Sequence, residues 1–328
     1  MYNILIPVFN EESEISACLE SVFDDIPLNV NIILVDNGSS DRSLECIANF
    51  KVCHSNLICL AEHRPGVVNA LNTGLKHIES GWVARMDADD IWLPGRHQFI
   101  QSIISDKGLP AKSIVSTGLQ YRTPGHKQLD FPSSQLLYDE ALCEWLFLFG
   151  NPLKHPTILY KAEQILSLGA YSNLFPHAED YDLWIRALEE DFSFLKYPDE
   201  TVLYTLPSQE ATHAAALNGK RNLQLVGNDA LMYRAFKNIG ADFTFDEICL
   251  LRIIFDAPEL SNVDPLANFE LQLLLEKFDD LIAKYSRFYS EKYKRCIPET
   301  SMAILKRDFQ AKRKRLVDGF NKLYPKVS

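Results

Sequence analysis

The sequence predicts an α/β protein with an open, mainly parallel twisted sheet flanked by helices over residues 1–210, and an all-helical region over residues 211–328. In the first 90 residues, short apolar runs that suit buried parallel strands alternate with segments whose apolar residues recur at helical spacing. This alternation is typical of right-handed strand–helix–strand units. Beyond about residue 210 the pattern is helical throughout, so we expect a second region there that contacts a binding partner, an oligomer or a membrane surface.

Individual elements follow from the same patterns. Strands are predicted at residues 4–9, 31–35, 57–61, 82–86, 113–118, 155–160, 194–197 and 202–206. Helices are predicted at residues 15–22, 44–48, 67–78, 94–104, 136–149, 163–168, 177–185, 217–239, 246–255, 268–289 and 300–324. The strongly apolar helix at 136–149 is expected to pack on the sheet.

Composition excludes several classes of protein. The chain has 328 residues, of which 47% are hydrophobic, enough for a large buried core. Its net charge of −11 argues against a general nucleic-acid binder. Seven cysteines without CxxC spacing predict free thiols in a reducing compartment. The N-terminus starts as a strand rather than a signal peptide, and no run of about 18 apolar residues predicts a membrane span. We therefore expect a cytoplasmic protein.

Three carboxylates follow the strand at 82–86 within four residues: Asp87, Asp89 and Asp90. Clustered acids repel one another, and a divalent cation would offset that repulsion. Hard cations prefer carboxylate oxygens and, with coordination positions left open, can also hold a diphosphate. The alternative is a solvated acidic turn. Because Asp36 also falls at a strand end, and ligands of parallel sheets bind there, we expect Asp36 and the acidic cluster to face one crevice.

Four ordered motifs resemble those of the family 2 glycosyltransferases of GT-A fold, in a bacterial branch of that family. They are Pro7-Val8-Phe9-Asn10-Glu11, Val35-Asp36-Asn37-Gly38-Ser39, Arg85-Met86-Asp87-Ala88-Asp89-Asp90 and His177-Ala178-Glu179-Asp180-Tyr181-Asp182-Leu183-Trp184. The second is similar to the family's VDDGS segment, the third to its DxD motif and the fourth to its ED motif. Any one of them is weak, whereas the ordered set is specific. The resemblance covers residues 2–205 and leaves out the C-terminal helices.

The resemblance implies inverting transfer of a sugar from a nucleotide diphosphate, by preference UDP, to a hydroxyl of a glycan or lipid-linked acceptor in cell-surface polysaccharide synthesis. Asp180 is then the general base that takes the hydroxyl proton. Mn²⁺ or Mg²⁺ is expected on Asp89 and Asp87, where it would neutralise charge on the departing diphosphate. Glu179 and Trp184 are expected at the acceptor, although Trp184 could equally be a core residue. The expected nucleotide-sugar contacts are Pro7, Val8, Phe9, Glu11, Asp36, Arg64, Asp87 and Ala88.

Some of these expectations compete with simpler ones. Asp36 would accept a hydrogen bond from a base N–H, or it caps a turn. Arg64 would contact the nucleotide, or it forms a surface salt bridge. Asn37 stands where the family usually has a second Asp. The segment Tyr204-Thr205-Leu206-Pro207 stands where many relatives have Tyr-Arg-x-His. If that His is a metal or diphosphate ligand in the relatives, its role here is vacant or falls to His213.

Other functions are weighed against the transferase. A dinucleotide-dependent oxidoreductase and a P-loop NTPase lack their glycine-rich motifs here. A sugar-phosphate nucleotidyltransferase and a non-catalytic nucleotide-sugar-binding scaffold are the remaining alternatives. The basic C-terminal segment, with Lys312 to Arg315 at its centre, suggests contact with an anionic membrane surface, and the alternatives are a solvated helix face or a homo-oligomer contact.

Overall fold

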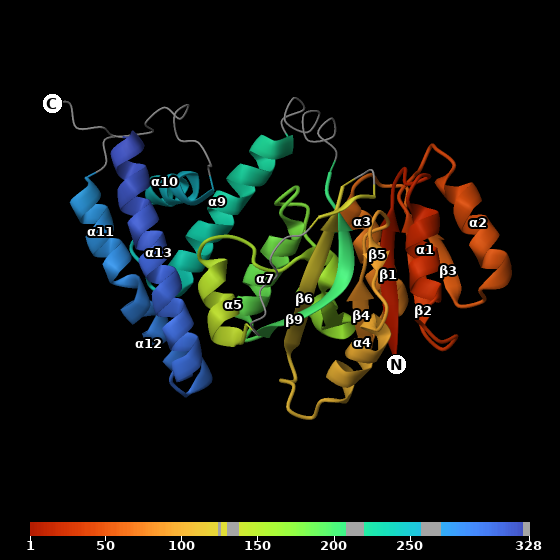
Figure 1. Cartoon of the computed structure of the whole chain (residues 1–328), viewed down its shortest axis with the longest axis horizontal. Helices are drawn as coiled ribbons and strands as arrows, with labels where there is room; N and C mark the ends of the chain where they lie inside the picture. The colour runs from red at the N-terminus through yellow and green to blue at the C-terminus, as the bar shows by residue number, and fades with distance from the viewer. Residues whose placement is uncertain (124–125, 130–137, 208–219, 257–269, 324–328) are drawn as a thin grey trace. The chain divides into compact units, whose positions relative to one another are not determined.

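The computed structural model describes residues 1–123, 126–129, 138–207, 220–256 and 270–323, shown in Figure 1. The chain divides into two compact units. The first comprises Met1–Leu137 and Leu153–Arg221, and the second comprises Tyr138–Pro152 and Asn222–Ser328. The predicted α/β class with C-terminal helices is confirmed. None of the helices in the described part of the chain has the length and apolarity that a membrane crossing requires.

The first unit is built on one nine-stranded sheet with the order β3-β2-β1-β4-β8-β6-β9-β5, and β7 pairs with β6. The strands are β1 (Tyr2–Val8), β2 (Asn31–Asp36), β3 (Leu57–Ala61), β4 (Trp82–Arg85), β5 (Ile91–Trp92), β6 (Ser113–Arg122), β7 (Gln128–Leu129), β8 (Leu159–Lys161) and β9 (Ser193–Thr205). The run from β3 to β4 is parallel, as predicted. Beyond β4 the sheet is mixed, because β8 runs antiparallel to both of its neighbours.

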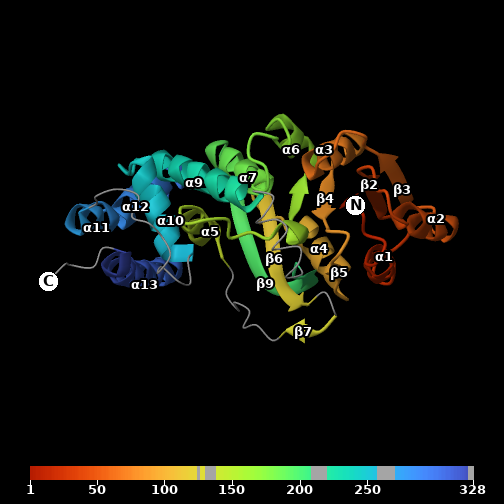
Figure 2. The ribbon, with the colours of Figure 1, turned by 90° about the horizontal axis from the view of Figure 1, so that it is seen from above.

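Helices cover both faces of the parallel part of the sheet. The helices of the first unit are α1 (Ile15–Phe23), α2 (Ser43–Cys53), α3 (Val67–Ile78), α4 (Arg96–Ser105), α6 (Ala162–Ser167) and α7 (Glu179–Glu189), with a 3₁₀ turn η1 (His155–Thr157). Ile4 and Ile6 of β1 lie in one core with Leu19 of α1. Leu5 points to the opposite face, where α3 approaches it at Gly74. Figure 2 shows α1 and α3 on opposite sides of these strands. Alternate residues of β1 are therefore buried against different helices.

Several predicted elements differ in extent. The two strands expected at 194–197 and 202–206 form the single strand β9, because Pro198 and its acidic neighbours continue the strand instead of turning. The β6–β9 register shifts at Gly118, where a Cβ would lie 2.8 Å from the Pro198 carbonyl oxygen, so only glycine fits without displacement. The expected strand at 155–160 is the turn η1 followed by β8. The two-residue strands β5 and β7 carry too little pattern to be predicted.

The second unit is helical in its described part. It contains α5 (Glu140–Phe147), α9 (Lys220–Asn238), α10 (Phe245–Asp256), α11 (Leu271–Asp279), α12 (Leu281–Tyr293) and α13 (Glu299–Leu323). The helix predicted at 136–149 as a cover for the sheet groups with this unit instead. Trp145 of α5 donates a 2.7 Å hydrogen bond to Asp308 of α13, and Tyr285 of α12 donates one of 2.6 Å to the Ala141 carbonyl. Polar anchors thus fix α5 among helices remote from it in sequence.

Replacing Gly74 should destabilise the first unit. The Cβ of Gly74→Ala would lie 2.2 Å from Leu5 Cδ1, and Leu5 is fully buried. We expect overpacking to cost about 1–3 kcal/mol, less the ~1 kcal/mol that alanine gains in helix propensity. Urea unfolding of the two proteins measures the difference. The control is Lys76→Ala, an exposed position of the same helix, which should change stability by less than about 0.5 kcal/mol.

Candidate active site

Three neighbouring strands end at the same edge of the sheet. In the β1–β2 register Val8 lies opposite Asp36, and in the β1–β4 register Leu5 lies opposite Arg85. The backbone continues this pairing past the strands, since Asn37 N–H donates to the Val8 carbonyl over 2.9 Å and Met86 N–H donates to that of Leu5 over 3.1 Å. The loops that follow β1, β2 and β4 therefore begin side by side, as expected for the carboxyl ends of parallel strands.

A cavity of about 480 Å³ opens between these loops. Its lining residues are Pro7, Val8, Phe9, Glu11, Asn37, Pro65, Gly66, Val67, Ala70, Asp87, Ala88, Asp89 and His177. Phe9 is 57% exposed, so its ring offers an apolar face to a ligand. An apolar wall facing a few convergent carboxylates is the usual composition of a small-molecule site.

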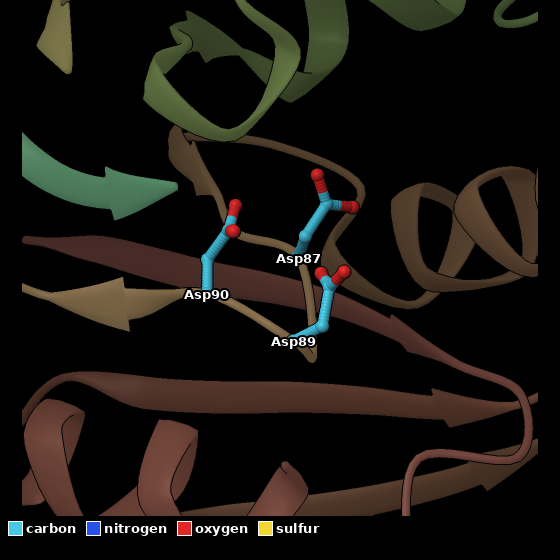
Figure 3. Close-up of side chains that lie close together, drawn as sticks. All are labelled: Asp87, Asp89 and Asp90. Atoms are coloured by element: carbon cyan, nitrogen blue, oxygen red, sulfur yellow. The ribbon is translucent and has the colours of Figure 1, made fainter. Parts of the chain in front are cut away.

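The acidic cluster lies in the loop between β4 and β5. Within the described residues, Asp87, Asp89 and Asp90 place one carboxylate oxygen each within 4.8 Å of the others. Figure 3 shows the three side chains projecting to the same side of this loop. Asp90 is fully buried, and although its Oδ1 accepts from Thr205 N–H over 2.8 Å, its Oδ2 has no hydrogen-bond partner. A buried acceptor without a donor, beside two more carboxylates, fits a divalent cation.

The electrostatics of the cluster support this interpretation. Burial and then the charge of Asp87 raise the pKa of Asp89 to about 6. Burial, followed by Asp87 and Asp89, raises that of Asp90 to about 9. Burial, followed by Asp89 and Asp87, raises that of Glu11 to about 8. Asp90 and Glu11 are therefore largely protonated at neutral pH, and a bound cation would favour their ionised forms.

Buried arginines support the acidic loop from behind. Arg85, at the end of β4, is 3% exposed and forms an ion pair with Asp87. Arg96 of α4 is also buried, and its Nη2 donates to the Arg85 carbonyl over 3.0 Å and to the Pro156 carbonyl over 2.8 Å. The Arg96 guanidinium lies 4.2 Å from the ring centroid of Trp92. The end of β4 is therefore held by the Arg85–Asp87 ion pair and by hydrogen bonds from the Arg96 side chain to backbone carbonyls.

The N-terminus of α7 brings His177, the first residue of the ED motif, to this site. His177, two residues before α7, lines the cavity in a left-handed backbone conformation with φ of 65°. Burial raises the pKa of Glu179, and the charges of Arg85 and Asp87 also act on it. Asp180 is half-buried, and its Oδ1 accepts from Tyr181 N–H over 2.7 Å. The structure thus brings Glu179 into electrostatic range of the acidic loop, while Asp180 lies outside the cavity lining.

Two residues that were predicted to contact the nucleotide, Asp36 and Arg64, have protein partners in the structure. The Asp36 carboxylate accepts from Gly38 N–H over 3.1 Å and from Ser39 N–H over 3.2 Å, which is the turn-capping alternative. Asn37 lines the cavity instead, and the pattern did not single it out as a contact. Arg64 forms the salt bridge that the sequence left open, with Nη2 2.7 Å from Glu62 Oε2. Neither arrangement tests whether Asp36 or Arg64 contacts a nucleotide.

Asn37 braces the loop that forms one wall of the cavity. Its Nδ2 donates to the Glu62 carbonyl over 3.0 Å and to the Arg64 carbonyl over 2.7 Å, and its Oδ1 accepts from Gly66 N–H over 2.7 Å. An aspartate could not donate to the two carbonyls. The amide at this position, which differs from the family pattern, therefore has a structural reason.

Two ring side chains, Trp184 of the ED motif and the neighbouring His155, belong to the core. Trp184 is fully buried, so its indole has no surface to offer a sugar, and the core alternative is favoured over the acceptor contact. His155 is buried against it, and His155 Nε2 lies 2.8 Å from the Tyr171 hydroxyl. Burial lowers the pKa of His155 well below its usual value, so this ring is neutral.

The structure therefore gathers most of the predicted donor-side residues around one cavity. Pro7, Val8, Phe9, Glu11, Asp87, Ala88 and Asp89 were predicted and line it. Asn37, Pro65, Gly66, Val67, Ala70 and His177 also line it and were not predicted as contacts. Pro65, Gly66, Val67 and Ala70 have apolar side chains or none, which give no chemical signal in the sequence, whereas Asn37 and His177 stand in quoted motifs. His213, the expected substitute for a missing ligand, lies outside the described residues.

Comparisons with known proteins agree with this geometry. Residues 3–108 match the family described as Glycosyl transferase family 2. The amylovoran biosynthesis glycosyltransferase AmsE of Erwinia amylovora is 27% identical over 252 residues, which cover 73% of this chain and 88% of that protein. The O-antigen biosynthesis glycosyltransferase WbnJ of Escherichia coli is 24% identical over 196 residues, covering 58% of this chain and 72% of WbnJ.

Solved structures share the fold. S. aureus TarS 1-349 in complex with UDP-GlcNAc superposes with a TM-score of 0.60 at 16% identity, covering 98% of this chain and 90% of that one. The mannosyltransferase PcManGT from Pyrobaculum calidifontis, in complex with GDP-Man and Mn²⁺, gives a TM-score of 0.55 at 16% identity, covering 99% and 87%. A mixed sheet with this cavity and acidic loop at the ends of its parallel strands is the architecture of the GT-A fold. The match of residues 3–108 and the similarity to AmsE support a family 2 glycosyltransferase of this fold.

Mn²⁺ should stabilise the folded chain through the acidic cluster. A ligand that binds only the folded state at 100 times its Kd adds about 2.7 kcal/mol to the free energy of unfolding. We expect Mn²⁺ to raise the unfolding temperature in a thermal-shift measurement, and Asp89→Asn to abolish the rise. Asp199→Asn, which alters an exposed acid of β9 outside the cluster, is the control and should retain it. An equal rise in Asp89→Asn would contradict this assignment.

Proposed function

We propose that the chain transfers a sugar, with inversion, from a nucleotide-diphosphate sugar to a hydroxyl of a glycan or lipid-linked acceptor in cell-surface polysaccharide synthesis. The observation that carries the proposal is the cavity between the ends of β1, β2 and β4, whose lining combines apolar residues with the carboxylates of Asp87 and Asp89. That combination suits a base and a metal-bound diphosphate in one pocket.

The relatives support the reaction class and the pathway. AmsE and WbnJ are named for amylovoran and O-antigen biosynthesis, and both products are polysaccharides. TarS has been solved with UDP-GlcNAc and PcManGT with GDP-Man and Mn²⁺. We take a UDP-sugar as the first donor to test and the cytoplasm, or the inner face of the membrane, as the location.

In the proposed mechanism each group of residues has one task. Phe9 and its neighbours hold the base, and the acidic cluster holds a divalent cation. When bound, that cation supplies positive charge that stabilises the departing diphosphate. The oxygen of the acceptor hydroxyl attacks the sugar carbon that bears the diphosphate, while Asp180 takes the hydroxyl proton. Glu179 forms a hydrogen bond with the acceptor. Inversion in a single displacement needs no enzyme nucleophile.

Asp180→Asn tests the assignment of the general base. Because the amide cannot accept the proton, we expect the transfer rate to fall by about 10²–10⁴-fold, with donor affinity unchanged. Single-turnover transfer and calorimetric titration with UDP measure the two quantities. Glu190→Gln, at an exposed acid beyond the end of α7, is the matched control. A variant with near-normal turnover would remove Asp180 from the mechanism.

Donor hydrolysis separates the transferase from its two alternatives. A transferase slowly releases UDP from a UDP-sugar when Mn²⁺ is present, because water replaces the acceptor. A non-catalytic scaffold would bind the sugar nucleotide without releasing UDP. A nucleotidyltransferase would form or consume nucleoside triphosphate instead.

We further propose contact of α13 with an anionic membrane surface. Three of its cations are engaged inside the unit. Lys312 Nζ lies 2.8 Å from Asp308 Oδ1, Arg313 Nη2 lies 2.9 Å from Asp279 Oδ2, and Arg315 Nε donates to the Ile254 carbonyl over 3.0 Å. The exposed cations of α13 are Lys306, Arg307, Lys314, Arg315 and Lys322. The largest apolar side chains of α13 are buried in the unit, so the attraction would be mainly electrostatic, worth about 1 kcal/mol per cation near the surface; they are Leu305, Phe309, Leu316, Phe320 and Leu323.

Vesicle sedimentation tests this contact. The charge-reversal variant carries Lys306→Glu, Arg307→Glu and Lys314→Glu. The control of equal net charge carries Lys51→Glu, Lys76→Glu and Lys107→Glu, all at exposed positions of the first unit. At low salt the unaltered chain and the control should sediment with phosphatidylglycerol vesicles, and the charge-reversal variant should not. Equal sedimentation of all three proteins would contradict a role for α13.

A further inference from the structure

We propose that Arg122 is a positioning residue for Asp89: it holds the backbone of the acidic loop so that the Asp89 carboxylate can bind a cation. The proposal rests on the metal-dependent function above. Arg122 ends β6 and lies opposite Thr205, which ends β9. The paired ends of two strands thus meet the loop that follows a third strand.

The contacts of the Arg122 side chain define one orientation. Its Nη2 donates to the Asp89 carbonyl over 2.9 Å and to Glu14 Oε2 over 2.8 Å. Its Nε donates to Thr205 Oγ1 over 2.7 Å, and its Nη1 lies 2.8 Å from His126 Nδ1. All three guanidinium nitrogens are engaged, and the side chain is only 6% exposed. Such a fork fixes its partners in direction as well as in distance.

Thr205 completes the hold on the acidic loop. Its hydroxyl donates to the Asp89 carbonyl over 2.5 Å, so that carbonyl accepts from both Thr205 and Arg122. The Thr205 backbone N–H donates to Asp90 Oδ1 over 2.8 Å. The backbone at Asp89 and the carboxylate at Asp90 are therefore fixed from the same side, which leaves the Asp89 carboxylate directed at the cavity. Neighbours that orient a ligand in this way commonly govern metal affinity.

A simpler role for Arg122 is to neutralise Glu14. Glu14 is close enough for its charge to act on Asp89, and its side chain is 14% exposed. On that account the positive charge of Arg122 would only offset the repulsion between Glu14 and Asp89. The two roles differ in what a second substitution does: if Glu14 is the reason for Arg122, removing both charges restores the site, whereas the loss of the Asp89 anchor cannot be repaired in this way.

Binding of Mn²⁺ alone to the full chain distinguishes the two roles. The electron paramagnetic resonance signal of free Mn²⁺ gives the Kd without any nucleotide. We expect Arg122→Lys, which keeps the charge and loses the fork, and Arg122→Gln each to weaken Mn²⁺ binding by about 10- to 100-fold. The double variant Glu14→Gln/Arg122→Gln should be as weak as Arg122→Gln. Native affinity in Arg122→Lys or in the double variant would overturn the proposal.

Controls separate positioning from loss of stability. Arg252→Lys alters a partly buried ion pair with Asp229 in the second unit, so it should change the unfolding temperature and leave Mn²⁺ affinity unchanged. Thr205→Val keeps the backbone N–H and the shape and removes only the hydroxyl, so it reports on the same anchor if Arg122 variants fold poorly. Native Mn²⁺ affinity in Thr205→Val would then count against the anchor.

The proposed function and this inference can fail separately. Suppose that the native chain binds Mn²⁺, that Arg122→Lys binds it more weakly, and that the native chain releases no UDP from a UDP-sugar. This combination would contradict the proposed reaction and support the role of Arg122. A native chain that binds no Mn²⁺ would overturn the role of Arg122 together with the metal site.

Discussion

Mutual repulsion among the carboxylates after β4 is the constraint on which the site depends. Three aspartates lie within reach of one cation, and Glu11 faces them across the cavity. Without a cation their burial is unfavourable, and it is tolerated because the rest of the first unit holds the loop in place. Arg85 pairs with Asp87, Arg96 anchors the strand end, and Arg122 contacts the Asp89 carbonyl. The unfavourable free energy of burying these carboxylates is thus offset by favourable contacts elsewhere in the first unit.

Sheet order explains how these groups meet. β1 lies between β2 and β4, so the loops after all three strands open on one edge although they are far apart in the chain. The helix α3 can approach β1 closely because position 74 is glycine. The mixed half of the sheet then returns β6 and β9 to the same edge, where Arg122 and Thr205 end as a pair. Each functional side chain therefore sits on a regular element or directly after one.

The two units differ in content: the first holds the candidate active site, and the second is a helical unit with its own core. The cavity and the acidic loop belong to the first unit, which also carries the match to the glycosyltransferase family. The second unit has its own core, in which Phe149, two residues after α5, packs against Phe236, Phe255 and Phe278. Ion pairs fix part of the basic face of α13 within that unit. Contacts of the second unit with acceptor, oligomer or membrane stay predictions.

Sequence alone determined the parallel strands, the strand-end acids and the resemblance to family 2, because hydrophobic period and ordered motifs are local properties of the chain. It also named seven of the thirteen residues that line the cavity. Only the tertiary structure decided that Asn37 rather than Asp36 lines the cavity, that Trp184 is core, that α5 joins the second unit, and that Arg122 reaches Asp89. These outcomes depend on which way a side chain points and on contacts between residues up to 163 positions apart, and no local pattern records either.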